Sequence, residues 1–152
     1  MTFRHPHIYF SKHSVLRTTD LDEARKTIAQ KFCDHRLDVL RRGASLDVVH
    51  NAVRGKNLSV NYLSYGADVI VNPGCLAEFY LFQLPLAGQA RVDHRGDEMT
   101  ACTRTGTLIN PDRTARLHWT ADCRQLLFQI DRTHLEAVAR TLTGAPLPGP
   151  IR

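Results

Sequence analysis

The sequence predicts a mainly β protein, an antiparallel β-barrel or sandwich with one helix before the strands and one after them. Between about residues 36 and 130 the chain consists of short runs rich in Val, Leu, Ile, Tyr and Phe. Turn residues interrupt these runs every eight to twelve positions, which is the spacing of strands in sandwiches and barrels. Because no helical period separates the runs, the strands must pair mostly antiparallel.

The apolar runs place ten strands along the chain. They cover residues 36–40, 46–53, 58–65, 67–72, 79–86, 89–94, 98–102, 107–109, 114–119 and 124–130. The segments between them have turn chemistry. Arg54–Asn57 and Arg95–Asp97 are typical of hairpin turns, Asn72–Gly74 of a turn that needs a positive φ, and Asn110–Asp112 of a further turn.

A helix is expected before the strands, at about residues 20–33. Asp20 stands at the position of a capping residue, and Glu23 follows three positions later, as in a capping box. Apolar residues recur on one face at helical spacing; they are Leu21, Ala24, Ile28 and Phe32. The sequence therefore predicts a short amphipathic helix.

A second helix is expected at residues 131–144, with Asp131 as its cap and Gly144 as its stop. Its apolar stripe consists of Leu135, Val138, Ala139 and Leu142. Two partners can bury this stripe, namely the chain's own barrel or the same helix of a second copy. The proline-rich residues 145–152 are interpreted as the beginning of a linker.

The chain of 152 residues is interpreted as one domain. Within it, residues 20–130 form the first helix and the barrel. The opening residues 1–18 mix basic and aromatic side chains, and two alternatives remain for them, an arm or an ordered strand. No apolar stretch approaches the roughly 18 residues of a membrane span, and the opening segment lacks the apolar core of a signal peptide. We therefore expect a cytoplasmic protein that does not contact a membrane.

The formal net charge is +5, which raises the question of nucleic-acid binding. The basic residues are scattered along the chain, and Arg41 and Arg42 are the only adjacent arginines. This distribution favours an ordinary solvated surface over a direct nucleic-acid groove.

Candidate catalytic and metal-binding patterns are weak. The only His-x-His pair is His5 and His7, at the extreme N-terminus and outside the strands, where a frayed, solvated pair is the more common outcome. The four cysteines lie far apart, without a Cys-x-x-Cys pair. No nucleophile elbow or glycine-rich phosphate loop occurs. We therefore expect no enzyme activity, no metal and no cofactor.

Alternate side chains of a small barrel point into its interior, where one small ligand can fit. The strand register expected from the sequence places five residues there as candidate ligand contacts. They are Tyr62, Tyr80, Phe82, His94 and Trp119. The alternative for each of them is an ordinary position in a filled core.

Three segments resemble a known family. Residues 58–92 contain the pattern Y-G-A-D-V followed by F-Y-L-x-Q-x-P-L-x-G, and residues 20–37 and 102–144 extend the similarity. Together they resemble the N-terminal regulatory domain of AraC/XylS-type transcription regulators over nearly the whole chain.

The resemblance implies a cupin-like antiparallel β-barrel of the jelly-roll type that senses a small-molecule effector. It also implies a homodimer through the helix after the barrel, with Leu135, Val138, Ala139 and Leu142 as interface residues. DNA binding belongs, by the same resemblance, to a separate C-terminal helix-turn-helix module that is absent from this chain. The alternatives are a stand-alone small cupin-fold enzyme or ligand-binding protein, and a purely structural dimerisation module.

Overall fold

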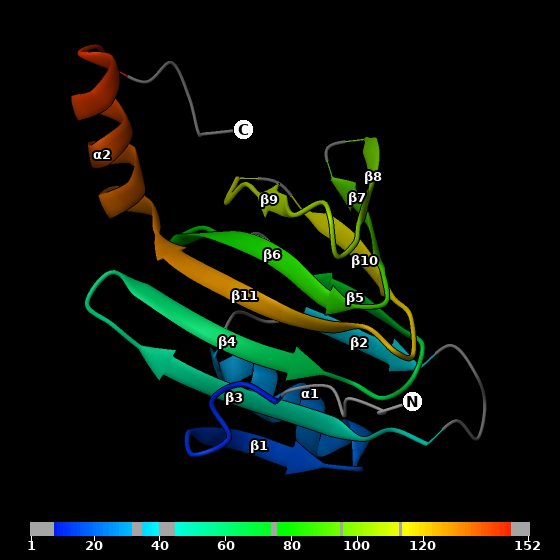
Figure 1. Ribbon diagram of the computed structural model, residues 1–152. Helices are drawn as coiled ribbons and strands as arrows, with labels where there is room; N and C mark the ends of the chain where they lie inside the picture. The colour runs from blue at the N-terminus through cyan, green and yellow to red at the C-terminus, as the bar shows by residue number, and fades with distance from the viewer. Residues whose placement is uncertain are drawn as a thin grey trace, which may run out of the picture.

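Two antiparallel sheets lie face to face, with one helix against the barrel and one projecting from it (Figure 1). The computed structural model describes residues 8–31, 35–39, 45–73, 76–94, 96–112 and 114–146. The chain passes back and forth between the two sheets, as in a jelly roll. The expected fold class, mainly β with flanking helices in a cupin-like arrangement, is confirmed.

The six-stranded sheet, called sheet A, has the strand order β1-β3-β4-β11-β6-β9. Every neighbouring pair in it is antiparallel. Its strands are β1 (Ser14–Thr18), β3 (Val48–Arg54), β4 (Leu58–Ser64), β11 (Arg124–Asp131), β6 (Phe79–Ala87) and β9 (Thr107–Ile109).

The five-stranded sheet, called sheet B, has the order β2-β5-β10-β7-β8. Its pairs are also antiparallel. Its strands are β2 (His35–Val39), β5 (Val69–Pro73), β10 (Ala115–Trp119), β7 (Ala90–His94) and β8 (Asp97–Ala101). Within the described residues no strand pairing joins sheet B to sheet A, so the two walls are held together by packing of their inner faces.

The core lies between these inner faces. Leu63 and Ile109 of sheet A and Val69 and Val92 of sheet B are almost completely buried there. Burial of such side chains is the main favourable term in folding, at about 25 cal/mol per Å² of apolar surface. The interior is therefore apolar over most of its length.

All ten strands expected from the sequence are present, with ends that differ from the expected ones by at most two residues. An eleventh strand, β1, forms from the opening segment for which an arm or a strand had been expected, and it pairs with β3. The hairpin expected at Arg54–Asn57 joins β3 to β4. Residues 1–7, 32–34, 40–44, 74–75, 95, 113 and 147–152 lie outside the described residues. Several sequence predictions fall among them, namely the pair His5 and His7, the end of the first helix at Phe32, the adjacent Arg41 and Arg42, Gly74 and Arg95 of two expected turns, and most of the expected linker.

Helix α1 (Leu21–Lys31) begins as expected from the sequence. The Asp20 carboxylate accepts hydrogen bonds from the backbone N–H groups of Asp22 and Glu23, at 2.8 and 3.2 Å. These bonds satisfy donors that the first turn of a helix leaves without partners. Ala24 and Ile28 are buried in the core, so the apolar stripe of α1 closes one side of the space between the sheets.

Helix α2 (Arg132–Thr143) ends as expected, at Gly144, whose φ of 69° lies in the left-handed region and whose N–H donates to the Arg140 carbonyl. Its start differs from the expectation, because the Asp131 side chain makes no capping hydrogen bond. Asp131 is the last residue of β11, and its N–H donates to the Asn57 carbonyl. Asp131 is therefore held by a backbone hydrogen bond of the strand region and does not act as a helix cap.

Arg132 attaches α2 to the barrel. Its guanidinium donates two hydrogen bonds to the Asp112 carboxylate, at 2.6 and 3.2 Å, and one to the Ala77 carbonyl at 3.3 Å. It also bonds Glu136, one turn along the helix, and Glu136 accepts a hydrogen bond from the Tyr80 hydroxyl at 2.8 Å. The hydrogen bond to Asp112 is the main cause that raises the pKa of Arg132. No residue of α2 is buried, so this polar cluster at its first turn holds the helix.

Neither described helix is long and apolar enough to cross a membrane.

Gly88, between β6 and β7, should be intolerant of any side chain. Its φ is +66°, and a Cβ atom there would lie 2.6 Å from the Cys123 backbone nitrogen. We expect Gly88→Ala to lower the free energy of unfolding by about 2–3 kcal/mol, from backbone strain together with displacement of Cys123. Gly96→Ala is the matched control, because its φ is +81° but no described atom lies within 4 Å of the added Cβ. It should cost only about 1 kcal/mol. Urea unfolding of both variants measures the difference, and equal losses would contradict the steric argument.

Removal of the Arg132 side chain should loosen α2 without unfolding the barrel. Arg132→Ala deletes the bonds to Asp112, Glu136 and the Ala77 carbonyl, so amide hydrogen exchange in α2 should accelerate about fivefold while exchange in β6 and β11 stays slow. Arg140→Ala is the control, because Arg140 is exposed in the same helix and makes no ion pair with any described residue. Similar acceleration in both variants would show that Arg132 does not anchor the helix.

Candidate functional site

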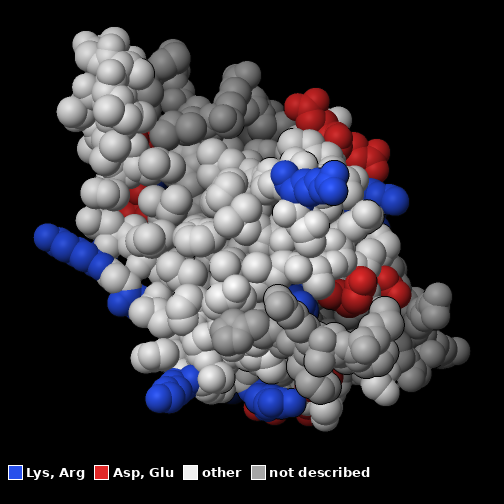
Figure 2. Space-filling model, viewed as in Figure 1, with Lys and Arg blue, Asp and Glu red and all other residues white. Residues whose placement is uncertain are grey.

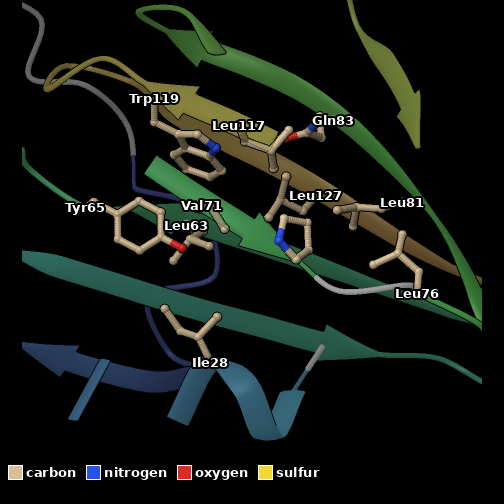
Figure 3. A pocket seen from close by; sticks show the side chains of 11 residues that line it. Ile28, Leu63, Tyr65, Val71, Leu76, Leu81, Gln83, Leu117, Trp119 and Leu127 are labelled. Carbon is tan, nitrogen blue, oxygen red and sulfur yellow. The ribbon is translucent and has the colours of Figure 1, made fainter. Parts of the chain in front are cut away.

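A cavity lies between the inner faces of the two sheets, closed below by α1 (Figure 3). Sheet A contributes Leu63, Leu81, Gln83 and Leu127, together with Tyr65, which directly follows β4. Sheet B contributes Val71, Pro73, Leu117 and Trp119, and the remaining contacts are Ile28 of α1 and Leu76. The lining contains no charged residue, so the cavity is built for apolar contact.

Two aromatic residues form one end of the cavity (Figure 3). The rings of Tyr65 and Trp119 pack edge to face, with centroids 4.9 Å apart and planes at 71°, a favourable arrangement for aromatic pairs. Both side chains are almost completely buried. Burial raises the pKa of the Tyr65 hydroxyl far above its ordinary value, with a smaller contribution from Cys123, so this hydroxyl is neutral at physiological pH.

The indole nitrogen of Trp119 is buried and has no hydrogen-bond partner among the described residues. Buried polar groups in proteins nearly always have a partner, and an unsatisfied donor costs roughly 1–3 kcal/mol. Such a group marks a place where a missing partner would be stabilising.

A short polar chain borders the apolar lining. Gln83 donates to the Thr107 hydroxyl at 3.2 Å and accepts from the Gln125 amide at 3.3 Å. All three residues are buried. The nitrogen and the oxygen of the Gln83 amide each have a partner, so this residue lies beside the cavity without an unsatisfied polar atom.

The cavity is small in this conformation, with a volume of about 40 Å³. Pockets for drug-sized ligands measure roughly 300–1,000 Å³. A ligand of that size therefore enters only if the side chains of the two sheets move apart.

The structure brings only one of the five candidate ligand contacts to this cavity, namely Trp119. Tyr62, Tyr80 and Phe82 lie on the other face of sheet A, because Leu63, Leu81 and Gln83 are the lining residues of the same strands. His94 is buried on the inner side of β7, beyond the lining. Ligand binding by any of the five stays a prediction.

The expected register failed in β4 and β6 because part of the outer face of these strands is also buried, at Tyr62 and Tyr80. Tyr62 is buried although it points away from the cavity, since the Tyr9 ring lies against it and the Arg124 guanidinium donates to its hydroxyl. Tyr80 is buried where its hydroxyl bonds Glu136 of α2. Among the five candidates, Trp119 had the clearest sequence signal. In its strand, A-R-L-H-W, apolar and polar residues alternate, and the apolar residues are the buried ones.

A second candidate surface is the apolar stripe of α2. Leu142 is 80% exposed and Val138 41% exposed, while Leu135 and Ala139 are partly buried. The helix projects away from both sheets (Figure 1). The alternative that the barrel covers the whole stripe therefore does not hold for Val138 and Leu142.

The outer face of sheet A is also apolar. One row of paired residues crosses five strands; it consists of Val53, Val60, Phe128, Phe82 and Leu108. These side chains are exposed or half-buried. Figure 2 shows that the surface over β4, β11 and β6 is almost free of charged side chains, which lie mainly around its margins.

Metal-binding geometry is not evident in the described part of the chain, where no three His, Cys, Asp or Glu side chains form a group that could hold an ion. Cys102 and Cys123 are free thiols. Burial raises the pKa of Cys123 to about 12, with a further contribution from Asp122, so this thiol is a core residue and not a nucleophile.

Comparisons with solved structures show the fold. The AraC-like transcriptional activator CuxR matches with a TM-score of 0.65 and 14% identity, over 86% of this chain and 52% of that one. The chain thus spans about half the length of the CuxR structure. The Schizosaccharomyces pombe Cnp3 cupin domain matches at a TM-score of 0.47 with 8% identity, over 70% of this chain and 79% of that chain. The uridine complex of Streptomyces PAC13 matches at 0.40 with 8% identity, over 61% and 74%.

The sequence comparison identifies the family. No curated protein matches the sequence significantly. The model of the AraC-binding-like domain matches residues 24–152, which include every described strand except β1, all of α2, and α1 from its fourth residue. The resemblance stated from the sequence motifs is thereby confirmed. The chain belongs to the family of AraC-binding-like domains.

Proposed function

We propose that this chain is the effector-sensing and dimerisation region of an AraC/XylS-type transcription regulator, whose DNA-binding module is separate from this sequence. The observation that carries the proposal is the family match over residues 24–152, on a fold similar to that of the activator CuxR. The uncharged cavity between the sheets supports the sensing part. The exposed stripe of α2 supports the dimerisation part.

A continuous set of contacts supports communication between the cavity and α2. Leu76 lines the cavity, and the next residue, Ala77, donates its N–H to the Pro111 carbonyl and accepts a hydrogen bond from Arg132. The N–H of Arg132 in turn donates to the Glu78 carbonyl. A ligand that displaces Leu76 would therefore shift the segment that holds the first turn of α2.

The principal alternative from another functional class is a small cupin-fold enzyme. Metal analysis of the purified protein separates the two, because a stoichiometric iron, zinc or manganese ion would favour the enzyme. The described residues offer no cluster of three ligands for such an ion, so no observation here favours this second function.

The dimerisation proposal rests on exposure of large apolar side chains. A leucine that is 80% exposed near the end of a projecting helix gains roughly 1.5–3 kcal/mol when it is fully buried. A two-fold interface presents the same patch on both subunits, so the stripe of one α2 would cover the stripe of the other.

The isolated chain should bind DNA without sequence specificity. Its net charge of +5 supplies attraction to phosphates, and this attraction weakens steeply as salt rises. Selection from a random duplex library at physiological salt should recover no enriched motif, although weak binding at low salt is expected. An enriched motif would contradict the assignment of DNA reading to a separate module.

Replacing Leu142 by Glu should dissociate the dimer. The symmetric interface would bury two unpaired carboxylates, which should raise the dissociation constant by at least about 100-fold. Light scattering across a concentration series measures the assembly, and an unchanged β-type circular dichroism spectrum confirms that the barrel remains folded.

Ala137→Glu is the matched control for this experiment. Ala137 lies on the same helix but on the side opposite the stripe, and it is exposed. This variant should dimerise like the parent chain. A monomeric parent chain, or a Leu142→Glu variant that stays dimeric, would show that α2 is not the dimer interface.

A further inference from the structure

We propose that the cavity between sheets A and B takes a small uncharged, mainly apolar molecule carrying one hydrogen-bond acceptor, such as a ketone, ester or ether, and that the acceptor bonds the indole N–H of Trp119. This inference rests on the proposed role of the cavity as the effector site and adds the chemical class of the effector. Charged molecules of the same shape are rejected.

The exclusion of charge follows from the lining. None of its eleven residues is acidic or basic, so an ionised carboxylate or amine would lose its hydration without gaining an ion pair, which is strongly unfavourable. The Gln83 amide is already bonded to Thr107 and Gln125. The Tyr65 hydroxyl stays neutral because burial raises its pKa. The site therefore offers no counter-charge to an ionic ligand.

The requirement for an acceptor follows from Trp119. Its side chain is only 2% exposed, and its N–H has no partner among the described residues. Figure 3 shows the nitrogen on the side of the ring that faces the other lining residues. An indole N–H donates and cannot accept, so a ligand that satisfies it must present an acceptor atom.

The architecture also provides a way to admit a molecule larger than the 40 Å³ void. The lining residues belong to two sheets that share no strand pairing in the described chain. Separation of the two inner faces by a small amount therefore disturbs side-chain packing but leaves the backbone ladders intact. The ligand replaces the apolar contacts that this movement removes.

Three probes of similar shape test the proposal, namely acetophenone, ethylbenzene and benzoate. Acetophenone has an apolar ring and a carbonyl acceptor, ethylbenzene lacks the acceptor, and benzoate is ionised at neutral pH. Because Trp119 is the only tryptophan, a proton–nitrogen correlation spectrum of the labelled chain contains one indole signal. That signal reports directly on a new hydrogen bond.

Acetophenone should bind saturably and move the indole proton signal downfield. Ethylbenzene should bind about tenfold more weakly and leave that signal without the downfield shift. Benzoate should bind at least about 100-fold more weakly. General repulsion does not explain that loss, because the chain carries a net charge of +5, which attracts anions.

Variants assign the contact. Trp119→Phe keeps an aromatic ring but removes the donor, so acetophenone should lose its advantage over ethylbenzene. Tyr65→Phe removes the hydroxyl group of the cavity lining, which is another possible donor, and should leave that advantage unchanged. If Tyr65→Phe abolishes the preference while Trp119→Phe keeps it, the assignment to Trp119 is overturned.

A final variant separates this inference from the proposed function. Leu63→Phe fills the cavity without changing its charge and should abolish binding of every probe; Val71→Leu serves the same purpose if the first variant fails to fold. Benzoate that binds as tightly as acetophenone and is blocked by Leu63→Phe would overturn the chemical class but leave the cavity as the sensing site. Absence of binding by all probes, or binding that survives the filled cavity, would overturn both.

Discussion

Packing of the inner face of sheet A against the inner face of sheet B is the interaction on which the other features of this domain depend. No strand pairing joins the sheets in the described chain, so apolar side chains such as Leu63 and Val69 hold the walls together. Packing of this kind is stabilised by the burial of apolar surface, and it has little directional preference. The domain can therefore be stable in its strands and adjustable between its layers.

Hydrogen bonds between buried polar groups show which parts of the interior are held in fixed positions. Gln83, Thr107 and Gln125 bond one another between the sheets, and His50 bonds Asn61 at 2.9 Å, while Asn61 donates to the Leu127 carbonyl. These pairs fix the position of sheet A strands relative to one another. The Trp119 N–H and the Gln125 Oε1 atom have no hydrogen-bond partner among the described residues, and of these two residues only Trp119 lines the cavity. The cavity therefore has an unpaired donor beside a small apolar void.

Helix α2 shows how the same barrel presents a surface to other molecules. Its first turn is tied to the barrel by Arg132, through Asp112 and the Ala77 carbonyl, whereas its later turns carry exposed Val138 and Leu142. The helix is thus fixed at one end and uncovered at the other. Since Ala77 follows the cavity residue Leu76, the anchored end lies next to the cavity.

The sequence by itself determined ten of the eleven described strands, the two helices, the cap at Asp20 and the stop at Gly144, because each depends on local alternation, turn chemistry or backbone conformation. The motifs within residues 58–92 likewise sufficed to identify the family. Only the tertiary structure decided which face of β4 and β6 lines the cavity. Alternation of polar and apolar residues shows which face of a strand is buried only when the other face is polar. Here Tyr62 on the outer face is covered by Tyr9, and Tyr80 on that face bonds Glu136 of α2. The polar residue Gln83, in contrast, points inward. Those partners lie 53 to 56 residues away along the chain, and no local pattern encodes a contact made over that distance.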